Sequence, residues 1–227
     1  MTFESCYTEN RFVQKSLDPT CRPELGRRIA GLPFVRKANR REPVFGSLNG
    51  LSSYPMNSKV MLVAIGKIEP HVLSHLCEAI NNTFHSECSQ GNPFPLPEVA
   101  FVPRRNQYIG SVILDGFGRG SAVHVLGVVD RDLFAPGLNF IYGQADLPGR
   151  RAVIALPRLR NSSYGEGENE GFFLERTIKE AVHELGHTFG LRHCSNRPCV
   201  MAFSNSMADT DFKNNEFCPK CAEMLGI

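Results

Sequence analysis

Hydrophobic residues in this chain occur in short runs, and turn-forming residues separate one run from the next. Three runs, at residues 60–65, 121–129 and 152–156, are nearly continuous and rich in β-branched side chains, which predicts buried strands. Two weaker runs, at residues 98–103 and 108–114, predict further strands.

Two other stretches carry apolar residues at helical spacing. Residues 70–86 start with Pro70, which favours the first turn of a helix, and form the first predicted helix. A second helix begins near Phe172, where apolar positions step by four, three, four and four residues along one face. These positions are Leu174, Ile178, Ala181, Leu185 and Phe189. The preceding residues, 161–171, are rich in Gly, Ser, Asn and Glu and predict an exposed loop. Strands followed by a long helix indicate an α+β domain with α/β-like order.

A short segment between Gly137 and Gly143 is expected to form an edge strand, because it is brief, largely apolar and bounded by glycines. Its residues are Leu138, Asn139, Phe140, Ile141 and Tyr142.

The chain is expected to divide into an irregular N-terminal extension, residues 1–57, and one domain, residues 58–227. Residues 22–41 hold seven basic residues against one acid, and prolines break any long helix in the extension. Two interpretations stay open for this basic arm: it touches an acidic partner, or it is a solvated segment that packs on the domain or stays mobile.

Composition narrows the class of protein. The 227 residues are 42% hydrophobic and 21% charged, as in an ordinary globular protein, and a net charge of +2 gives no reason to expect a nucleic-acid partner. No apolar run is long enough for a membrane span, and residues 1–10 lack the features of a signal peptide. We therefore expect a cytoplasmic monomer. The chain has eight cysteines, and in a reducing compartment those that cluster in the sequence are expected to be metal ligands rather than disulfides.

The strongest chemical signal lies on the second helix, at His183, Glu184 and His187. Two histidines four residues apart share one face of a helix, so both imidazoles can reach one metal ion. Glu184 lies one residue round the helix, where it can flank a metal-bound water. The alternative is a pair of surface histidines on an amphipathic helix.

A third ligand follows after a turn. Gly190 can end the helix in a left-handed conformation, and the chain can then bring His193 back to the metal. Three protein ligands and one open position suit a catalytic zinc, which lowers the pKa of its bound water to about 7. These residues therefore predict hydrolysis with Glu184 as the general base. The alternative for His193 is an ordinary loop histidine.

Four cysteines near the C-terminus have the spacing of a second metal site. Cys194 and Cys199 form one close pair and Cys218 and Cys221 another, which suits a closed tetrahedral zinc site. Such a site would tie the loop after the active helix to the C-terminal tail. Three alternatives stay open: a thioredoxin-like redox pair at Cys218 and Cys221, disulfides in an exported protein, and iron in place of zinc.

Met201 lies between the two cysteine pairs and just after the histidines, so we expect it to form a methionine turn beneath the catalytic zinc. An ordinary core methionine is the alternative. Among the other cysteines, Cys77 lies on the apolar side of its helix and predicts a buried thiol, whereas Cys6, Cys21 and Cys88 receive no role.

Together these motifs resemble the archaemetzincins, a family of metzincin-clan zinc metalloproteases. The resemblance rests on the histidine motif, the methionine and the two cysteine pairs, and it covers roughly residues 60–227. It implies a mixed twisted sheet, a backing helix, an active-site helix and a small zinc-bound C-terminal lobe at residues 191–227. It also implies that the edge strand at residues 138–142 pairs with extended substrate. We expect two zinc ions per chain, one catalytic and one structural.

The expected function is a zinc peptidase that acts on peptides or unfolded protein. A zinc-stabilised binding module with little catalysis is an alternative, which Glu184 disfavours because a scaffold needs no carboxylate beside the metal. A binder of nucleic acid or of an acidic partner through residues 22–41 is a further alternative. Only Phe34 is interleaved with the arginines there, so base stacking is not expected.

Overall fold

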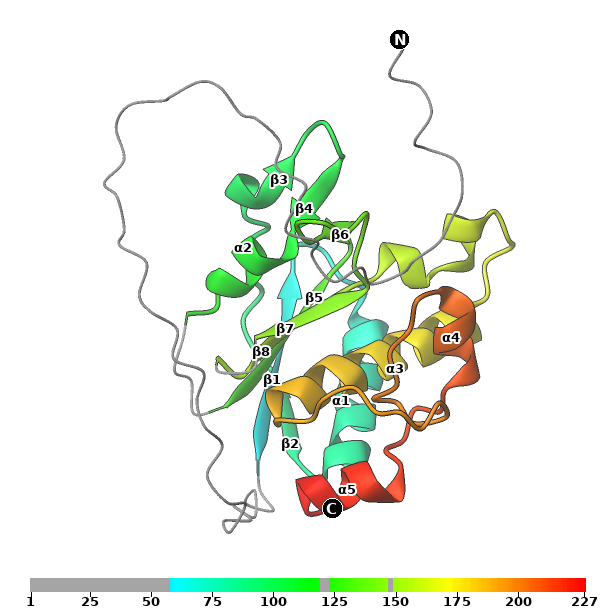
Figure 1. Ribbon diagram of the computed structural model, residues 1–227. Helices are drawn as coiled ribbons and strands as arrows, with labels where there is room; N and C mark the ends of the chain where they lie inside the picture. Colours follow the sequence, from blue (N-terminus) through cyan, green and yellow to red (C-terminus); the bar gives the residue numbers. More distant parts are fainter. Residues whose placement is uncertain (1–57, 119–122, 147–148) are drawn as a thin grey trace, which may run out of the picture. The chain divides into compact units, whose positions relative to one another are not determined.

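The computed structural model describes residues 58–118, 123–146 and 149–227 (Figure 1). The N-terminal extension expected at residues 1–57 lies outside the described residues, and so does the start of the strand expected at residues 121–129. In the part that is described, no helix is both long and apolar enough to cross a bilayer.

A five-stranded mixed sheet forms the centre of the domain. Its order is β2-β1-β5-β8-β7, with four parallel strands and β7 antiparallel at one edge. The strands are β1 (Lys59–Ile65), β2 (Glu87–Gln90), β5 (His124–Val129), β7 (Gly143–Asp146) and β8 (Arg151–Ala155). Both β5 and β8 are buried along their whole length, which explains why their sequences are continuous apolar runs.

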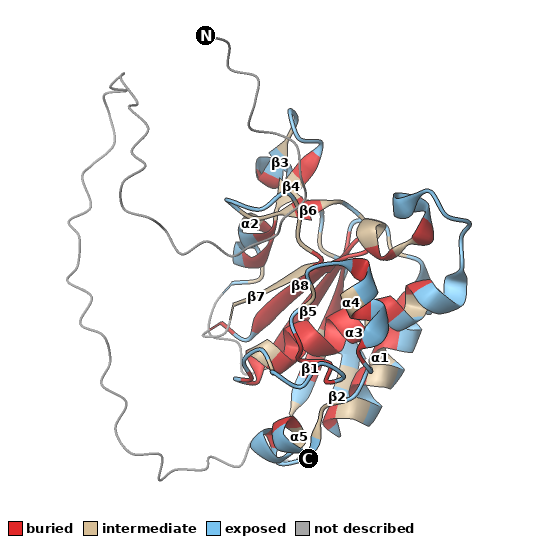
Figure 2. Cartoon of the chain, turned by 45° about the vertical axis from the view of Figure 1, so that its right-hand side comes forward, coloured by how far each residue is buried: buried red, intermediate tan, exposed pale blue. Residues whose placement is uncertain are grey.

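Two long helices, α1 (Pro70–Phe84) and α3 (Glu170–Thr188), cover one face of this sheet (Figures 1 and 2). Pro70 opens α1, while the side chain of Asn169 accepts a hydrogen bond from the backbone N–H of Phe172 and caps α3. The buried side of each helix joins one apolar cluster with alternate residues of the strands, among them Leu126 and Ile154. The α+β fold expected from the sequence is confirmed.

A smaller element packs on the other face of the sheet. It contains β3 (Phe101–Val102), β4 (Gln107–Ile109), β6 (Leu133–Phe134) and helix α2 (Gly110–Asp115), after a short 3₁₀ turn at Glu98–Ala100. The strands predicted at residues 98–103 and 108–114 are therefore largely wrong. Ile113 and Leu114 bury their side chains from a helix against Val129, and a short apolar run does not distinguish the two conformations.

The edge strand predicted at residues 138–142 is also wrong, because the edge strand of the sheet is β7, which follows it. Arg105 donates to the carbonyl oxygens of Leu138 and Asn139 at 3.3 and 2.7 Å, and Gln107 donates to Asn139 at 2.9 Å. These side chains occupy the carbonyl groups that a strand would offer to a neighbour. Regular pairing with β8 begins only where the Ala155 N–H donates to the carbonyl of Tyr142 at 2.7 Å.

The C-terminal segment is mostly irregular and carries two short helices, α4 (Met207–Phe212) and α5 (Pro219–Leu225). A capping box between Ser206 and Asp209 starts α4, and Pro219 opens α5. Between the sheet and α3, the expected loop at residues 161–171 holds a 3₁₀ helix, Asn161–Tyr164, after another at Pro157–Leu159. This segment is exposed beyond its first residue, since Asn161 is buried.

Candidate active site and metal centres

His183 and His187 lie one turn apart on α3 and point their Nε2 atoms at each other, 3.2 Å apart. The Nδ1 atom of each ring is 2.8 Å from a backbone carbonyl oxygen, that of Val200 for His183 and that of Leu191 for His187. A carbonyl only accepts, so each Nδ1 carries the proton and each Nε2 presents a lone pair. Two lone pairs face to face repel unless a cation lies between them.

His193 completes the cluster after a tight turn. Gly190 has a φ of 93°, and its N–H donates to the carbonyl of His187 at 2.9 Å, so the helix ends as expected. The ring of His193 then lies 5.3 Å from that of His183 and 4.9 Å from that of His187, measured between centroids. One ligand atom from each histidine lies within 4.8 Å of the others.

The histidine cluster fits zinc. With zinc–nitrogen bonds of about 2.0 to 2.1 Å, tetrahedral geometry separates two ligand nitrogens by about 3.3 to 3.4 Å. The His183–His187 distance of 3.2 Å is close to this value. Burial lowers the pKa of all three imidazoles, and the positive charge of Lys213 also lowers each pKa. The rings therefore favour the neutral form that a metal ion requires.

Glu184 lies next to His183 and is buried, together with Glu180 one turn earlier on α3. Burial and the neighbouring carboxyl of Glu180 raise the pKa of Glu184, and the two carboxyl groups share a hydrogen bond. Lys213, only 2% exposed, opposes this shift and donates to the carbonyl of Ala202 at 3.3 Å. The carboxyl of Glu184 thus lies in a buried cluster of two acids and one ammonium group.

Strand β7 touches the same carboxyl. A Cβ atom placed on Gly143 would lie 2.6 Å from Cγ and 2.9 Å from Oε1 of Glu184. Only a residue without a side chain lets the edge strand approach Glu184 this closely.

The four cysteines form a second cluster, in which all Sγ atoms lie within 4.8 Å of one another. Tetrahedral zinc–sulfur bonds of about 2.3 Å separate two sulfurs by about 3.8 Å, and the Cys194–Cys218 distance is 3.8 Å. Backbone N–H groups also point at sulfur, since the N–H of Cys218 lies 3.3 Å from Sγ of Cys199. A hydrogen bond from the backbone of Cys221 lowers the pKa of Cys218 to about 6, whereas burial raises the pKa of Cys199 and of Cys221. The cluster therefore fits zinc held by thiolates.

One short segment joins the two clusters. The carbonyl of Val200 orients His183, the N–H of Cys194 donates to the carbonyl of Met201 at 2.9 Å, and Cys194 follows His193 directly. Met201 is fully buried beneath the histidines, where a Cβ on Gly186 would lie 2.4 Å from its sulfur. Met201 therefore packs directly against α3 between His183 and His187.

The structure does not bear out every expectation about the cysteines. Cys77 is not a buried free thiol, because it forms a disulfide with Cys88, across a Cα–Cα distance of 5.3 Å. Strand β2 brings Cys88 beside α1, where Asn81 accepts a hydrogen bond from its N–H at 2.6 Å. Cys6 and Cys21 lie outside the described residues.

Sequence reasoning missed the carbonyl partners of the histidines, Val200 and Leu191. It also missed four residues that contact the site or act on its charges: Glu180, Lys213, Gly143 and Phe203. Glu180 lies four residues before Glu184 on the helix, so its spacing was a usable signal. Phe203, 57% exposed, packs its ring 4.9 Å from that of His193 and follows the expected methionine turn closely. Lys213 and Gly143 reach the site only through the tertiary fold, so no local pattern indicates them.

Comparison with known proteins identifies the family. The sequence model of peptidase family M54 matches residues 106–226 of this chain. The archaemetzincin of Methanopyrus kandleri is 46% identical over 132 residues, which cover 57% of this chain and 72% of that protein. The archaemetzincin of Methanocaldococcus jannaschii is 36% identical over 170 residues, which cover 75% of this chain and 94% of that protein.

Comparison with solved structures leads to the same family as the sequence comparisons. The crystal structure of the Methanopyrus kandleri archaemetzincin superposes with a TM-score of 0.66 at 38% identity, over 76% of this chain and 95% of that one. The Archaeoglobus fulgidus archaemetzincin in complex with malonate superposes with a TM-score of 0.65 at 34% identity, over 73% of this chain and 99% of that one. The chain therefore belongs to the archaemetzincins, peptidase family M54, and is a zinc metallopeptidase.

Proposed function

We propose that this peptidase hydrolyses peptide bonds at a zinc ion held by His183, His187 and His193, with Glu184 as the general base. One observation carries the proposal: the Nε2 atoms of His183 and His187 face each other at 3.2 Å, while a backbone carbonyl oxygen lies 2.8 Å from each Nδ1. The residue after His183, Glu184, is a buried carboxyl group.

When bound, zinc polarises the scissile carbonyl and lowers the pKa of its water to about 7. The carbonyls of Val200 and Leu191 hold the two helical imidazoles in the tautomer that presents Nε2. Glu184 removes the proton from the attacking water and delivers it to the leaving amine. The ammonium group of Lys213 favours the ionised form of Glu184 that this step needs.

We further propose that the four cysteines hold a second, structural zinc ion, so that each chain carries two. This ion would fix the segment that positions His193, Val200 and Met201. Binding of structural zinc contributes about 10 to 16 kcal/mol in peptide systems, which is ample to order a lobe with two short helices. On this view the peptidase unit is residues 58–227, with its C-terminal lobe at residues 191–227.

The free edge of β7 is the surface we propose for the peptide. β8 pairs with one side of β7, and no described strand pairs with the other. An extended peptide can add to such an edge through backbone hydrogen bonds. Because Gly143 touches Glu184, a peptide on this edge would lie beside the general base.

Cleavage of a diverse peptide library, read by mass spectrometry, tests the proposal. Zinc-loaded protein should produce new termini, and Glu184→Ala at equal zinc content should produce none. Equal products from both proteins would refute the role of Glu184. No products from the wild type, with both clusters loaded, would favour a zinc-stabilised binding module.

A further inference from the structure

We propose that the pocket beside His193, which three residues of the four-cysteine cluster help to line, is a substrate subsite that takes a large apolar side chain of the peptide. This inference rests on the proposed function. It gives the second metal cluster a part in recognition, in addition to its structural part.

The pocket has a volume of about 510 Å³ and lies between two segments of the C-terminal lobe. One wall is the chain around Leu191 and His193, and the other is Pro219 and Met224 of α5. Cys194, Cys218 and Cys221 line it as well. Since His193 belongs both to the histidine cluster and to the pocket wall, a side chain in the pocket is close to the scissile bond.

The walls offer apolar contacts to a partner. Met224 is 54% exposed on α5 and lines the pocket, so its apolar side chain is available to a bound side chain. A methionine can adapt to side chains of different shape, and the sulfur atoms of the cysteines are polarisable. The pocket is large enough for a leucine, methionine or aromatic side chain.

Charge does not favour an acidic or a basic occupant. Arg192 and Lys220 line the pocket, no carboxylate does, and neither cation has an ion-pair partner in the described part of the chain. Four thiolates around one zinc ion carry a net charge of about −2, which offsets these two cations. The polar lining residues Ser195 and Asn196 carry no charge, and the rest of the lining includes Leu191, Pro219 and Met224. A pocket that is nearly neutral overall selects an uncharged side chain, because burying an unpaired charge there is costly.

The test starts from the cleavage profile of the wild type, which identifies the position next to the scissile bond where large apolar residues are enriched. Two peptides that differ only there, leucine against aspartate, are then titrated into zinc-loaded Glu184→Ala protein by fluorescence anisotropy. We expect the leucine peptide to bind about tenfold more tightly or better. Met224→Asp, in the same background, should remove most of this preference.

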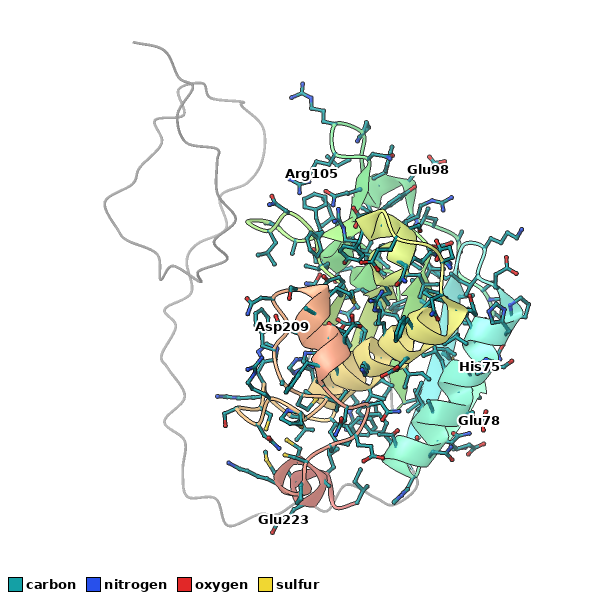
Figure 3. All side chains as sticks on the ribbon, turned by 90° about the vertical axis from the view of Figure 1, so that its right-hand side faces the viewer. His75, Glu78, Glu98, Arg105, Asp209 and Glu223 are labelled. Carbon is teal, nitrogen blue, oxygen red and sulfur yellow. A yellow bond between two sulfur atoms is a disulfide. The ribbon has the colours of Figure 1, made fainter. Side chains whose placement is uncertain are left out.

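A second variant and a control make the test specific. Met224→Phe narrows the pocket and should shift the cleavage profile towards smaller apolar residues. The control is Val99→Asp, which places the same charge on a residue that is 83% exposed. In Figure 3 its neighbour Glu98 lies at the opposite end of the domain from Glu223, the neighbour of Met224. This control should leave the preference unchanged.

The outcomes separate the two proposals. If the wild type cleaves peptides but the Met224 variants keep the same profile and the same ratio of affinities, the subsite is refuted and the peptidase stands. A uniform loss of affinity for both peptides in Met224→Asp also refutes the subsite. If the wild type cleaves nothing, the proposed function fails, and the subsite, which rests on a scissile bond beside the pocket, fails with it.

Discussion

Gly186 lies in the interior of α3 between His183 and His187, and its replacement by alanine sets two opposite effects against each other. Glycine in a helix interior is unfavourable by about 1 kcal/mol relative to alanine, so helix propensity alone predicts that Gly186→Ala stabilises the protein. The structure predicts the reverse. The new Cβ would lie 2.4 Å from the sulfur of Met201, 3.2 Å from its Cε and 3.4 Å from the ring of Phe217.

The relative sizes of the overpacking cost and the helix-propensity gain decide whether Gly186→Ala stabilises or destabilises the protein. Met201 is fully buried, so its side chain has no solvent into which it can move. Overpacking a core by one methyl group costs about 1 to 3 kcal/mol. Against a gain of about 1 kcal/mol from helix propensity, we expect Gly186→Ala to destabilise the protein by about 1 kcal/mol. In a Met201→Ala background the obstacle is gone, so the same substitution should stabilise by about 1 kcal/mol.

A double-mutant cycle tests this expectation. The free energy of unfolding is measured in urea, at a fixed concentration of free zinc, for the wild type, Gly186→Ala, Met201→Ala and the double variant. The coupling free energy between the two sites should be about 2 kcal/mol. A Gly186→Ala protein more stable than the wild type, with no coupling to Met201, would show that the close approach beneath the histidines is not as the structure has it.

Four further changes test other parts of the site. Gly143→Ala should push Glu184 aside and lower kcat about tenfold or more at unchanged zinc content, measured by steady-state kinetics and elemental analysis; unchanged kcat would contradict the contact. Burial lowers the pKa of His124 to about 4, so below pH 6.5 the unfolded chain takes up a proton that the folded chain does not. The free energy of unfolding should therefore fall by about 2 kcal/mol more between pH 7 and pH 5 in the wild type than in His124→Gln, and equal slopes in urea unfolding would refute this. Lys213→Met leaves two buried carboxyl groups without their cation and should destabilise by about 3 to 5 kcal/mol, so an unchanged denaturation midpoint would contradict the charge cluster. Cys218→Ser should remove one zinc ion and lower the melting temperature, whereas retention of full zinc content would exclude the thiolate site.

The parts of the fold that the sequence predicts well are those whose signal is local. Strands β1, β5 and β8 are buried on both faces, so their side chains form continuous apolar runs that periodicity detects. The histidines of α3 lie one helical turn apart, and Gly190 marks the end of the helix, so spacing alone brings His183, His187 and His193 together.

The missed parts depend on contacts between distant segments. The strand expected at residues 138–142 is irregular because Arg105 and Gln107, more than thirty residues earlier, bind its carbonyl groups. Lys213 comes near Glu180 only when the segment that follows α4 folds back onto α3. A single sequence shows the type of each residue but not which distant neighbour satisfies its hydrogen bonds or its charge.

Anomalous diffraction from zinc-loaded crystals, recorded on both sides of the zinc absorption edge, tests the central claim most directly. We predict two peaks per chain, one bounded by His183, His187 and His193 beside Glu184, and one at the centre of the four cysteines. A single peak at the cysteines, with none at the histidines in crystals that contain saturating zinc, would contradict the proposed catalytic centre.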